Sequence, residues 1–186
     1  IYDISENKLS PSFSRLSELV DQSIYTIEER SANKALITGI STGFRELDKM
    51  TSGFQNSDLI IIAGRPSMGK TAFALDIARN ASTLENISVA IFSLEMSKEQ
   101  LALRLLCSEA RVDSSKIRSG FFSTEDHAKI TNAASIFTET NIYIDDSPNI
   151  TAMGIRAKAR RLKMEKSLDM IIIDYIQLMR TKSHKE

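Results

Sequence analysis

Residues 59–71 read Leu59-Ile60-Ile61-Ile62-Ala63-Gly64-Arg65-Pro66-Ser67-Met68-Gly69-Lys70-Thr71, and this stretch decides the fold. The first five residues are a short apolar run rich in isoleucine, which predicts a buried β-strand. The next eight match G-x-x-x-x-G-K-[ST], the pattern of a loop that wraps phosphate groups between a strand and a helix. Residues 72–75 (AFAL) continue as a helix. The sequence therefore predicts an α/β domain that binds a nucleoside triphosphate.

The residue types in this loop suit phosphate binding. Gly64 and Gly69 allow backbone angles that a Cβ would hinder, so successive N–H groups can point at phosphate oxygens. The loop precedes a helix, and the N-terminus of a helix favours an anion. We expect Lys70 to reach the β- and γ-phosphates, and the Thr71 hydroxyl to join the shell of a Mg²⁺ ion. The candidate nucleotide-binding residues are Gly64, Arg65, Pro66, Ser67, Met68, Gly69, Lys70 and Thr71.

Composition indicates a soluble intracellular domain. The 186 residues are 42% hydrophobic and 26% charged, which is enough for one ordinary core. Lys plus Arg equals Asp plus Glu at 24 each, so net charge gives no argument for nucleic-acid binding. The single cysteine, Cys107, cannot form an internal disulfide, which favours a reducing compartment. We expect no membrane span, because the apolar run at 59–63 is far shorter than the ~20 residues required.

The pattern along the chain predicts two parts: a linker over residues 1–36 and an α/β domain over residues 37–186. Ser10-Pro11 is typical of a helix start, with serine as the cap and proline at the first helical position. Apolar residues then recur at spacings of three and four, which predicts an amphipathic helix over about 12–32. This helix either covers its own domain or docks on a neighbouring subunit. The sequence leaves both possibilities open.

After the phosphate-binding loop, helical and strand patterns alternate, which predicts a mainly parallel sheet flanked by helices. Helices are predicted at about 44–50, 70–81, 97–111, 123–137 and 151–166. Further strands are predicted at 88–93, 141–145 and 169–174. The pairs Ser97/Gln100 and Ser123/Asp126 have the spacing of capping boxes.

Two predicted strands end in an aspartate that could hold the Mg²⁺ shell beside the loop. Asp174 follows four consecutive large apolar residues, as expected of a central parallel strand that is buried on both faces. Asp145 follows Ile-Tyr-Ile, which fits a more peripheral strand. The burial pattern therefore favours Asp174 for the metal-organising role, with Asp145 as the alternative.

Glu95 follows the strand at 88–93, at the edge where open α/β sheets collect ligands. A carboxylate there can orient and deprotonate an attacking water, but it can equally be an exposed loop residue. The pattern alone leaves both interpretations open. The basic run at 156–166 is either a solvated face or a face that binds an anion or a partner. His127 and His184 stand apart from any metal or triad pattern.

Four segments together resemble the replicative hexameric DNA helicases of the DnaB type. The matching segments are residues 37–48 (ITGISTGFRELD), 64–71 (GRPSMGKT), 91–97 (IFSLEMS) and 171–179 (IIIDYIQLM). The phosphate-binding loop occurs in many unrelated nucleotide hydrolases, whereas SLEMS and IDYIQLM together are far more specific. The likeness covers almost the whole chain, and residues 12–32 are similar to the linker helix of that family.

The resemblance implies a RecA-like ATPase core in a ring of six subunits, with ATP and Mg²⁺ as ligands. By likeness, Lys70 and Thr71 bind nucleotide and metal, Glu95 is the catalytic base, and Asp174 is the second acid of the metal site. The family moves along single-stranded DNA, unwinds duplex at the cytoplasmic replication fork, and works with primase and a loader. Family members continue with DNA-binding loops and an arginine for the neighbouring site, so we expect an incomplete ATPase domain.

The sequence also leaves two other functions open. One is a RecA-like recombinase or another ring ATPase, although IDYIQLM and the preceding linker helix argue against it. The other is an assembly module that binds ATP without hydrolysing it. ATP turnover with and without single-stranded DNA distinguishes these possibilities.

Overall fold

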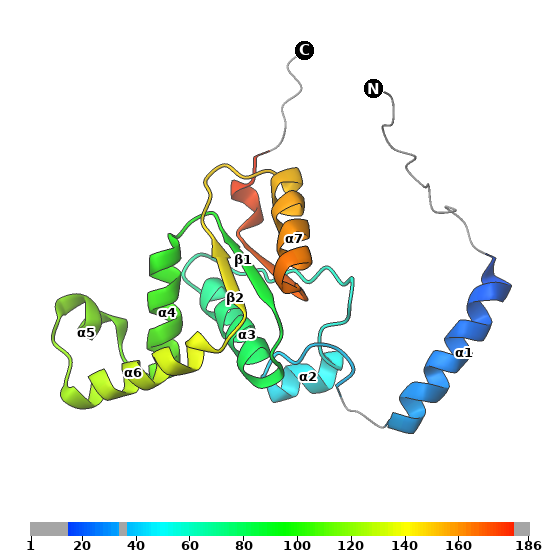
Figure 1. Cartoon of the computed structure of the whole chain (residues 1–186), viewed down its shortest axis with the longest axis horizontal. Coiled ribbons are helices and arrows are strands. Elements are labelled where there is room, and N and C mark those ends of the chain that lie inside the picture. The colour runs from blue at the N-terminus through cyan, green and yellow to red at the C-terminus, as the bar shows by residue number, and fades with distance from the viewer. Residues whose placement is uncertain (1–14, 34–36, 181–186) are drawn as a thin grey trace, which may run out of the picture. The chain divides into compact units, whose positions relative to one another are not determined.

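The computed structural model describes residues 15–33 and 37–180, and the chain divides into two compact units at residues 36 and 37. The described part of the first unit is α1 (Leu16–Asn33), the blue helix of Figure 1. The helix predicted over 12–32 is confirmed from Leu16 onward, whereas Ser10, Pro11 and Phe13 lie outside the described residues. Within this unit the large apolar side chains of α1 are exposed, including Val20, Ile24 and Ile27.

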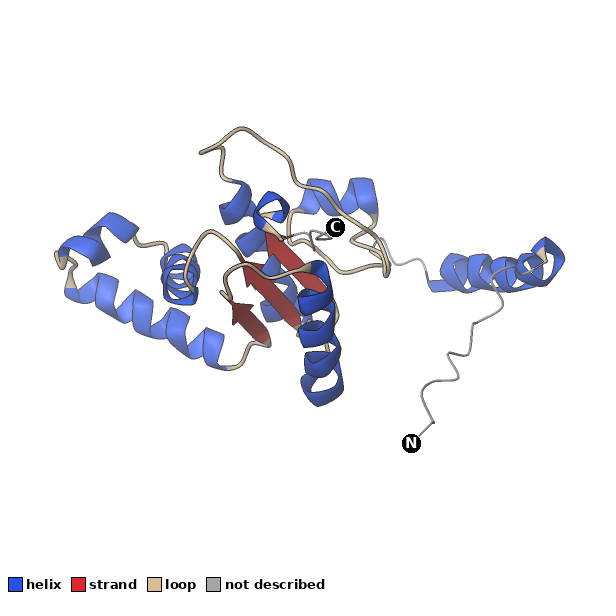
Figure 2. Ribbon diagram, turned by 90° about the horizontal axis from the view of Figure 1, so that it is seen from above, coloured by secondary structure: helices blue, strands red, loops and turns tan. Residues whose placement is uncertain are grey.

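The second unit contains a parallel sheet of three strands within its described residues 37–180. These strands are β1 (Val89–Ser93), β2 (Ile142–Asp145) and β3 (Met170–Asp174), in the order β2-β1-β3. Central β1 hydrogen-bonds to both neighbours, and Val89 pairs with Ile142 on one side and Met170 on the other. Figure 2 shows the three arrows side by side with helices on either side of them.

Most helices lie where the sequence predicts them. They are α2 (Arg45–Thr51), α3 (Lys70–Glu85), α4 (Lys98–Ala110), α5 (Ser114–Ser119), α6 (Thr124–Thr138), α7 (Ala152–Lys166) and the 3₁₀ helix η1 (Ile176–Leu178). Both predicted capping boxes are present, at the starts of α4 and α6. Short α5 was not predicted; Asp113 caps it by accepting a hydrogen bond from the N–H of Ser115. Within residues 15–33 and 37–180, no helix has both the length and the apolar character to cross a membrane.

The core has two layers because successive side chains of β1 point to opposite faces of the sheet. Val89 and Ile91 pack with buried residues of α3 and α4 on one face. Ala90 and Phe92 pack with Ile155 and Ala159 of α7 on the other face. All five residues of β1 are buried. The phosphate-binding helix α3 and the basic helix α7 therefore cover opposite faces of the same strand.

The strand predicted over residues 59–63 is wrong. This segment has no regular secondary structure, and Leu59 and Ile61 are 86% and 78% exposed. The segment lacks the hydrogen-bond ladder of a strand: no backbone group of 59–63 makes a hydrogen bond within the described residues. Strand β3 pairs only with β1 in this part of the chain, so its other edge is open. An apolar run predicts that a segment is buried, but it does not tell whether the segment pairs with a neighbouring strand.

Asp48 organises the turn-rich segment that precedes the loop. It lies in α2, is 3% exposed, and accepts hydrogen bonds from the Thr42 N–H and hydroxyl at 2.8 and 2.7 Å and from the Ser41 hydroxyl at 2.7 Å. Gly43 has a φ of +76°, and a Cβ there would meet Asn80 at 2.3 Å. Asn80, in α3, donates to the Thr42 carbonyl at 2.9 Å. The segment is therefore attached to the phosphate-binding helix.

We predict that Asp48→Asn destabilises the fold by about 1–3 kcal/mol, because an amide cannot accept all of these hydrogen bonds. Burial raises the pKa of Asp48, but the hydrogen bonds from Thr42, Ser41 and Gly43 outweigh burial and hold the pKa below its usual value. The contribution of Asp48 is thus present above the unfolded pKa of about 3.9 and lost as pH falls through the folded pKa. The free energy of unfolding of the parent chain and of Asp48→Asn, measured with urea at neutral and acidic pH, tests this prediction.

The matched control is Glu46→Gln, which neutralises an exposed carboxylate of the same helix that pairs with Lys49. It should leave the unfolding midpoint nearly unchanged, because exposed ion pairs contribute little. Equal losses in the two variants, or a loss in Asp48→Asn that does not shrink on acidification, would contradict the assignment.

Candidate functional site

The loop at 64–69 leads directly into α3. Gly69 is the N-cap residue of α3 with a φ of +87°, and Ser67 also has a positive φ of 63°. A Cβ at Gly69 would meet nothing within 4 Å, so its backbone angle, and not lack of space, is what favours glycine there. The first turn of α3 contains no acidic residue that would oppose an anion. The loop therefore presents unpaired helix N–H groups beside an exposed surface.

The Lys70 side chain folds back onto the start of this loop. Its Nζ donates to the Gly64 carbonyl at 3.0 Å and lies 5.9 Å from the centre of the Tyr175 ring. The ammonium is thus close to the N–H groups of the helix start, where both would act on the same anion. The contact with Tyr175 was not predicted; the only sequence signal is an aromatic residue directly after the strand acid.

Thr71 and Asp174 are 103 residues apart in sequence and meet in the structure. The Thr71 hydroxyl donates to the Asp174 carboxylate at 2.8 Å. Strand pairing places Asp174 opposite Ser93 at the carboxyl end of β1, and the Leu94 N–H donates to the Asp174 carbonyl at 2.7 Å. Hydroxyl and carboxylate oxygens are ligands that Mg²⁺ accepts. This pair can therefore hold a magnesium ion beside a phosphate bound in the loop.

Glu95 lies at the same edge of the sheet, two residues after β1 ends. The turn is fixed from both sides: the Ser93 hydroxyl donates to the Met96 carbonyl at 2.7 Å, and the capping box at Ser97 starts α4. Glu95 is exposed, and no side chain of the described residues pairs with its carboxylate. A free carboxylate on a fixed turn can accept a proton from a water molecule at this edge.

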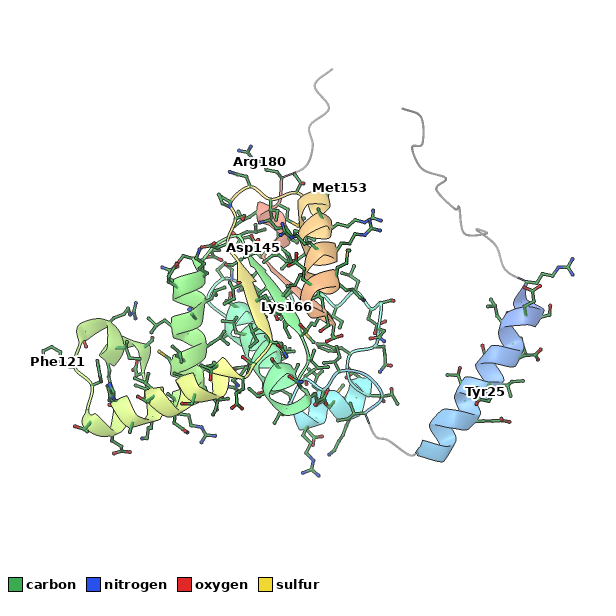
Figure 3. All side chains as sticks on the ribbon, viewed as in Figure 1. Tyr25, Phe121, Asp145, Met153, Lys166 and Arg180 are labelled. Carbon is green, nitrogen blue, oxygen red and sulfur yellow. The ribbon has the colours of Figure 1, made fainter. Side chains whose placement is uncertain are left out.

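The Asp145 carboxylate is paired with residues outside the phosphate-binding loop. It ends β2, which lies on the other side of β1 from β3, and it pairs with Lys158 of α7 and accepts from the Ser147 N–H at 2.9 Å. Burial raises the pKa of Asp145, but the hydrogen bonds from Lys158 and Ser147 outweigh burial and hold it below its usual value. Figure 3 labels Asp145 at the end of this strand. Its interactions are those of a structural ion pair between β2 and α7.

No group of three or more His, Cys, Asp or Glu side chains within residues 15–33 and 37–180 could hold a metal ion. A magnesium site at Thr71 and Asp174 would consequently depend on phosphate and water for its remaining ligands, which is usual for Mg²⁺. Cys107 is buried in α4, and the His127 ring stacks on Phe122 at 6.3 Å. Neither residue belongs to the site.

Comparison with known proteins gives matches over most of the chain. Residues 39–186 match the family described as the DnaB-like helicase C terminal domain. The chain is 51% identical over 179 residues to replicative DNA helicase DnaB of Geobacillus stearothermophilus, covering 96% of this chain and 39% of that protein. It is 49% identical to replicative DNA helicase DnaC of Bacillus subtilis (strain 168), with the same coverage. The chain thus spans about two fifths of these relatives.

Two solved structures have the same fold. One is an ATPase domain, which superposes with a TM-score of 0.82 at 34% identity, covering 90% of this chain and 60% of that one. The other, a DnaB-like replicative helicase solved in a study of its interactions with primase, has a TM-score of 0.81 at 34% identity and covers 89% and 41%. The predicted RecA-like α/β fold is therefore confirmed. By its family match and these identities, the chain belongs to the DnaB-like helicase family, and residues 39–186 correspond to the C-terminal domain of that family.

Proposed function

We propose that this chain is a motor segment of an ATP-dependent replicative DNA helicase, which hydrolyses ATP to move along single-stranded DNA and unwind duplex. The observation that carries the proposal is the 2.8 Å hydrogen bond between Thr71 and Asp174. It joins the phosphate-binding loop to the end of β3, so one site contains a cation, a hydroxyl and a carboxylate. P-loop nucleotide hydrolases use this combination to bind the phosphates and Mg²⁺.

In this proposal each side chain has a separate role in hydrolysis. The ammonium of Lys70 leaves the Gly64 carbonyl and binds the β- and γ-phosphate oxygens, while the loop N–H groups of residues 64–69 hold the same phosphates. Glu95 accepts a proton from the water that attacks the γ-phosphorus, and the bond to the β–γ bridging oxygen breaks. Thr71 and Asp174 would hold Mg²⁺, which when bound neutralises phosphate charge.

The partners follow from the family and from the relative solved with primase. We propose that residues 1–36 are a linker and residues 37–186 an ATPase domain, assembled as a homo-hexamer on single-stranded DNA. The exposed apolar side chains of α1 support docking on an adjacent subunit. Primase and a helicase loader are the proposed protein partners, and the cytoplasmic replication fork is the proposed location.

The decisive experiment is ATP turnover with and without single-stranded DNA, together with duplex unwinding, for this chain and for a version as long as its relatives. A helicase motor shows DNA-stimulated turnover and unwinding in the longer protein. DNA-stimulated turnover without unwinding would indicate a recombinase-like ATPase. ATP binding without turnover in the longer protein would indicate an assembly module.

Lys70→Ala should remove most of the affinity for triphosphate and leave the fold intact, because the ammonium lies beside the phosphate-binding loop and its only hydrogen bond within the described residues is an exposed one to the Gly64 carbonyl. Loss of one charged hydrogen-bond donor predicts a decrease of at least about tenfold in affinity. Calorimetric titration with an ATP analogue measures it. Lys129→Ala, which removes an exposed lysine of α6, is the control. Unchanged affinity in folded Lys70→Ala would refute the phosphate assignment.

Glu95→Gln keeps the size of the side chain but cannot accept a proton, so hydrolysis should slow by about 10²–10⁴. Nucleotide affinity and ring assembly should remain normal. Asp145→Asn should leave turnover within a few-fold, because Asp145 is paired with Lys158 on the other side of β1. Steady-state phosphate release in the longer protein compares the two variants. If Asp145→Asn stops turnover while Glu95→Gln keeps near-normal turnover, the catalytic base is not Glu95 but lies on β2.

Deletion of the residues before Ala32 should shift the chain toward monomer in light scattering, because it removes all but the last two residues of α1, with its large apolar side chains. Ile24→Ser combined with Ile27→Ser should reproduce the shift while keeping the rest of the chain. Glu28→Gln, a change to an exposed polar residue of the same helix, should leave the mass unchanged. If the shortened chain assembles as the full chain does, α1 is not needed for assembly and instead covers its own domain.

A further inference from the structure

The solvent face of α7 has a composition that its role in the core does not explain. Ile155 and Ala159 bury the opposite side of the helix against Ala90 and Phe92. The solvent face presents Met153, Arg156, Arg160 and Met164, at spacings of three, four and four residues, which places them in one row. We call these four residues the α7 row. Figure 3 labels Met153 at one end of this helix and Lys166 at the other.

The two methionines of the α7 row are 59% and 88% exposed. Single exposed apolar residues are common and need no explanation. Here, however, they lie at the two ends of one row, about 16 Å apart along the helix. Met and Arg are enriched in protein interfaces, whereas Lys and Glu are depleted. The row therefore has the composition of an interface.

The two arginines of the row have no partner within the described residues. Helix α7 carries six Lys or Arg and one Glu, which gives 6 − 1 = +5, whereas the formal charge of the whole chain is zero. Lys158 pairs with Asp145, and Arg161 pairs with Glu165, but no described carboxylate lies within ion-pair distance of Arg156 or Arg160. Both guanidinium groups are therefore available to pair with an anionic partner.

We propose that the α7 row docks an acidic helical segment of a partner protein, with two apolar side chains of that segment on Met153 and Met164 and its carboxylates on Arg156 and Arg160. Nucleic acid is the less suitable anion. Phosphates would satisfy the arginines but leave both methionines in water, and α7 has no aromatic side chain on which a base could stack. A helix that carries both carboxylates and apolar side chains can pair with the two arginines and also cover the two methionines of the row.

The test uses the whole 186-residue chain and a fluorescein-labelled synthetic peptide with one Glu-rich and one Leu-rich helical face. Fluorescence anisotropy measures its affinity beside that of a scrambled peptide of the same composition and of oligo-dT. We expect the ordered peptide to bind more tightly than the other two. Equal affinity for the scrambled peptide, or tighter binding of oligo-dT, would overturn the proposal.

Three matched variants locate the contact. Arg156→Gln with Arg160→Gln should weaken peptide binding by about tenfold, since two exposed ion pairs are lost. Met153→Gln with Met164→Gln, which keeps side-chain length, should weaken it by a similar factor of about ten. Arg161→Gln removes one positive charge from the same helix, at an arginine already paired with Glu165, and should have little effect. Equal effects of the arginine variants, or no effect of the methionine variant, would refute docking on the row.

Discussion

The structure of residues 37–180 depends on β1 being enclosed on every side. Its neighbours β2 and β3 satisfy its backbone groups, and helices cover both of its faces. A strand in this position must be buried, and β1 is buried along its whole length. Its one polar residue, Ser93, donates its hydroxyl hydrogen to the Met96 carbonyl. Parallel pairing in turn fixes where the neighbouring strands end. The site exists because β1 and β3 end at the same level, at Ser93 and Asp174.

This arrangement explains why residues from distant parts of the chain share one edge. The first turn of α3 brings Lys70 and Thr71 to the end of β3, where each contacts one of two successive residues, Tyr175 and Asp174. Glu95 reaches the same edge through the turn after β1. Asp145 ends its own strand at a comparable level, but its ion pair with Lys158 uses its charge to attach α7. The two aspartates at strand ends thus have different neighbours, because β2 and β3 lie on opposite sides of β1.

Much of the fold was predictable because local signals agree with the tertiary structure. The capping boxes and the start of the helix after the phosphate-binding loop each specify a short stretch of backbone. The run that ends in Asp174 forms a strand as predicted, but the prediction of a central strand buried on both faces is wrong: within the described residues β3 is an edge strand and is only partly buried. The features that could not be predicted depend on distant partners. The run at 59–63 has the residues of a strand but no paired neighbour among the described residues, and the contacts Lys70–Tyr175 and Asp145–Lys158 join segments with no local relation. The roles of the site residues remain predictions.

The attachments of α3 have a mechanical consequence. This helix of 16 residues begins at the phosphate-binding loop, and near its other end Asn80 donates to the Thr42 carbonyl while Glu85 accepts from the Ser41 N–H. A helix of this length is a stiff rod of about 24 Å. A tilt or translation imposed at Lys70 must therefore reappear at Ser41 and Thr42, where Asp48 transmits it to α2. The segment around Asp48 thus lies at the far end of a lever whose near end is the phosphate-binding loop.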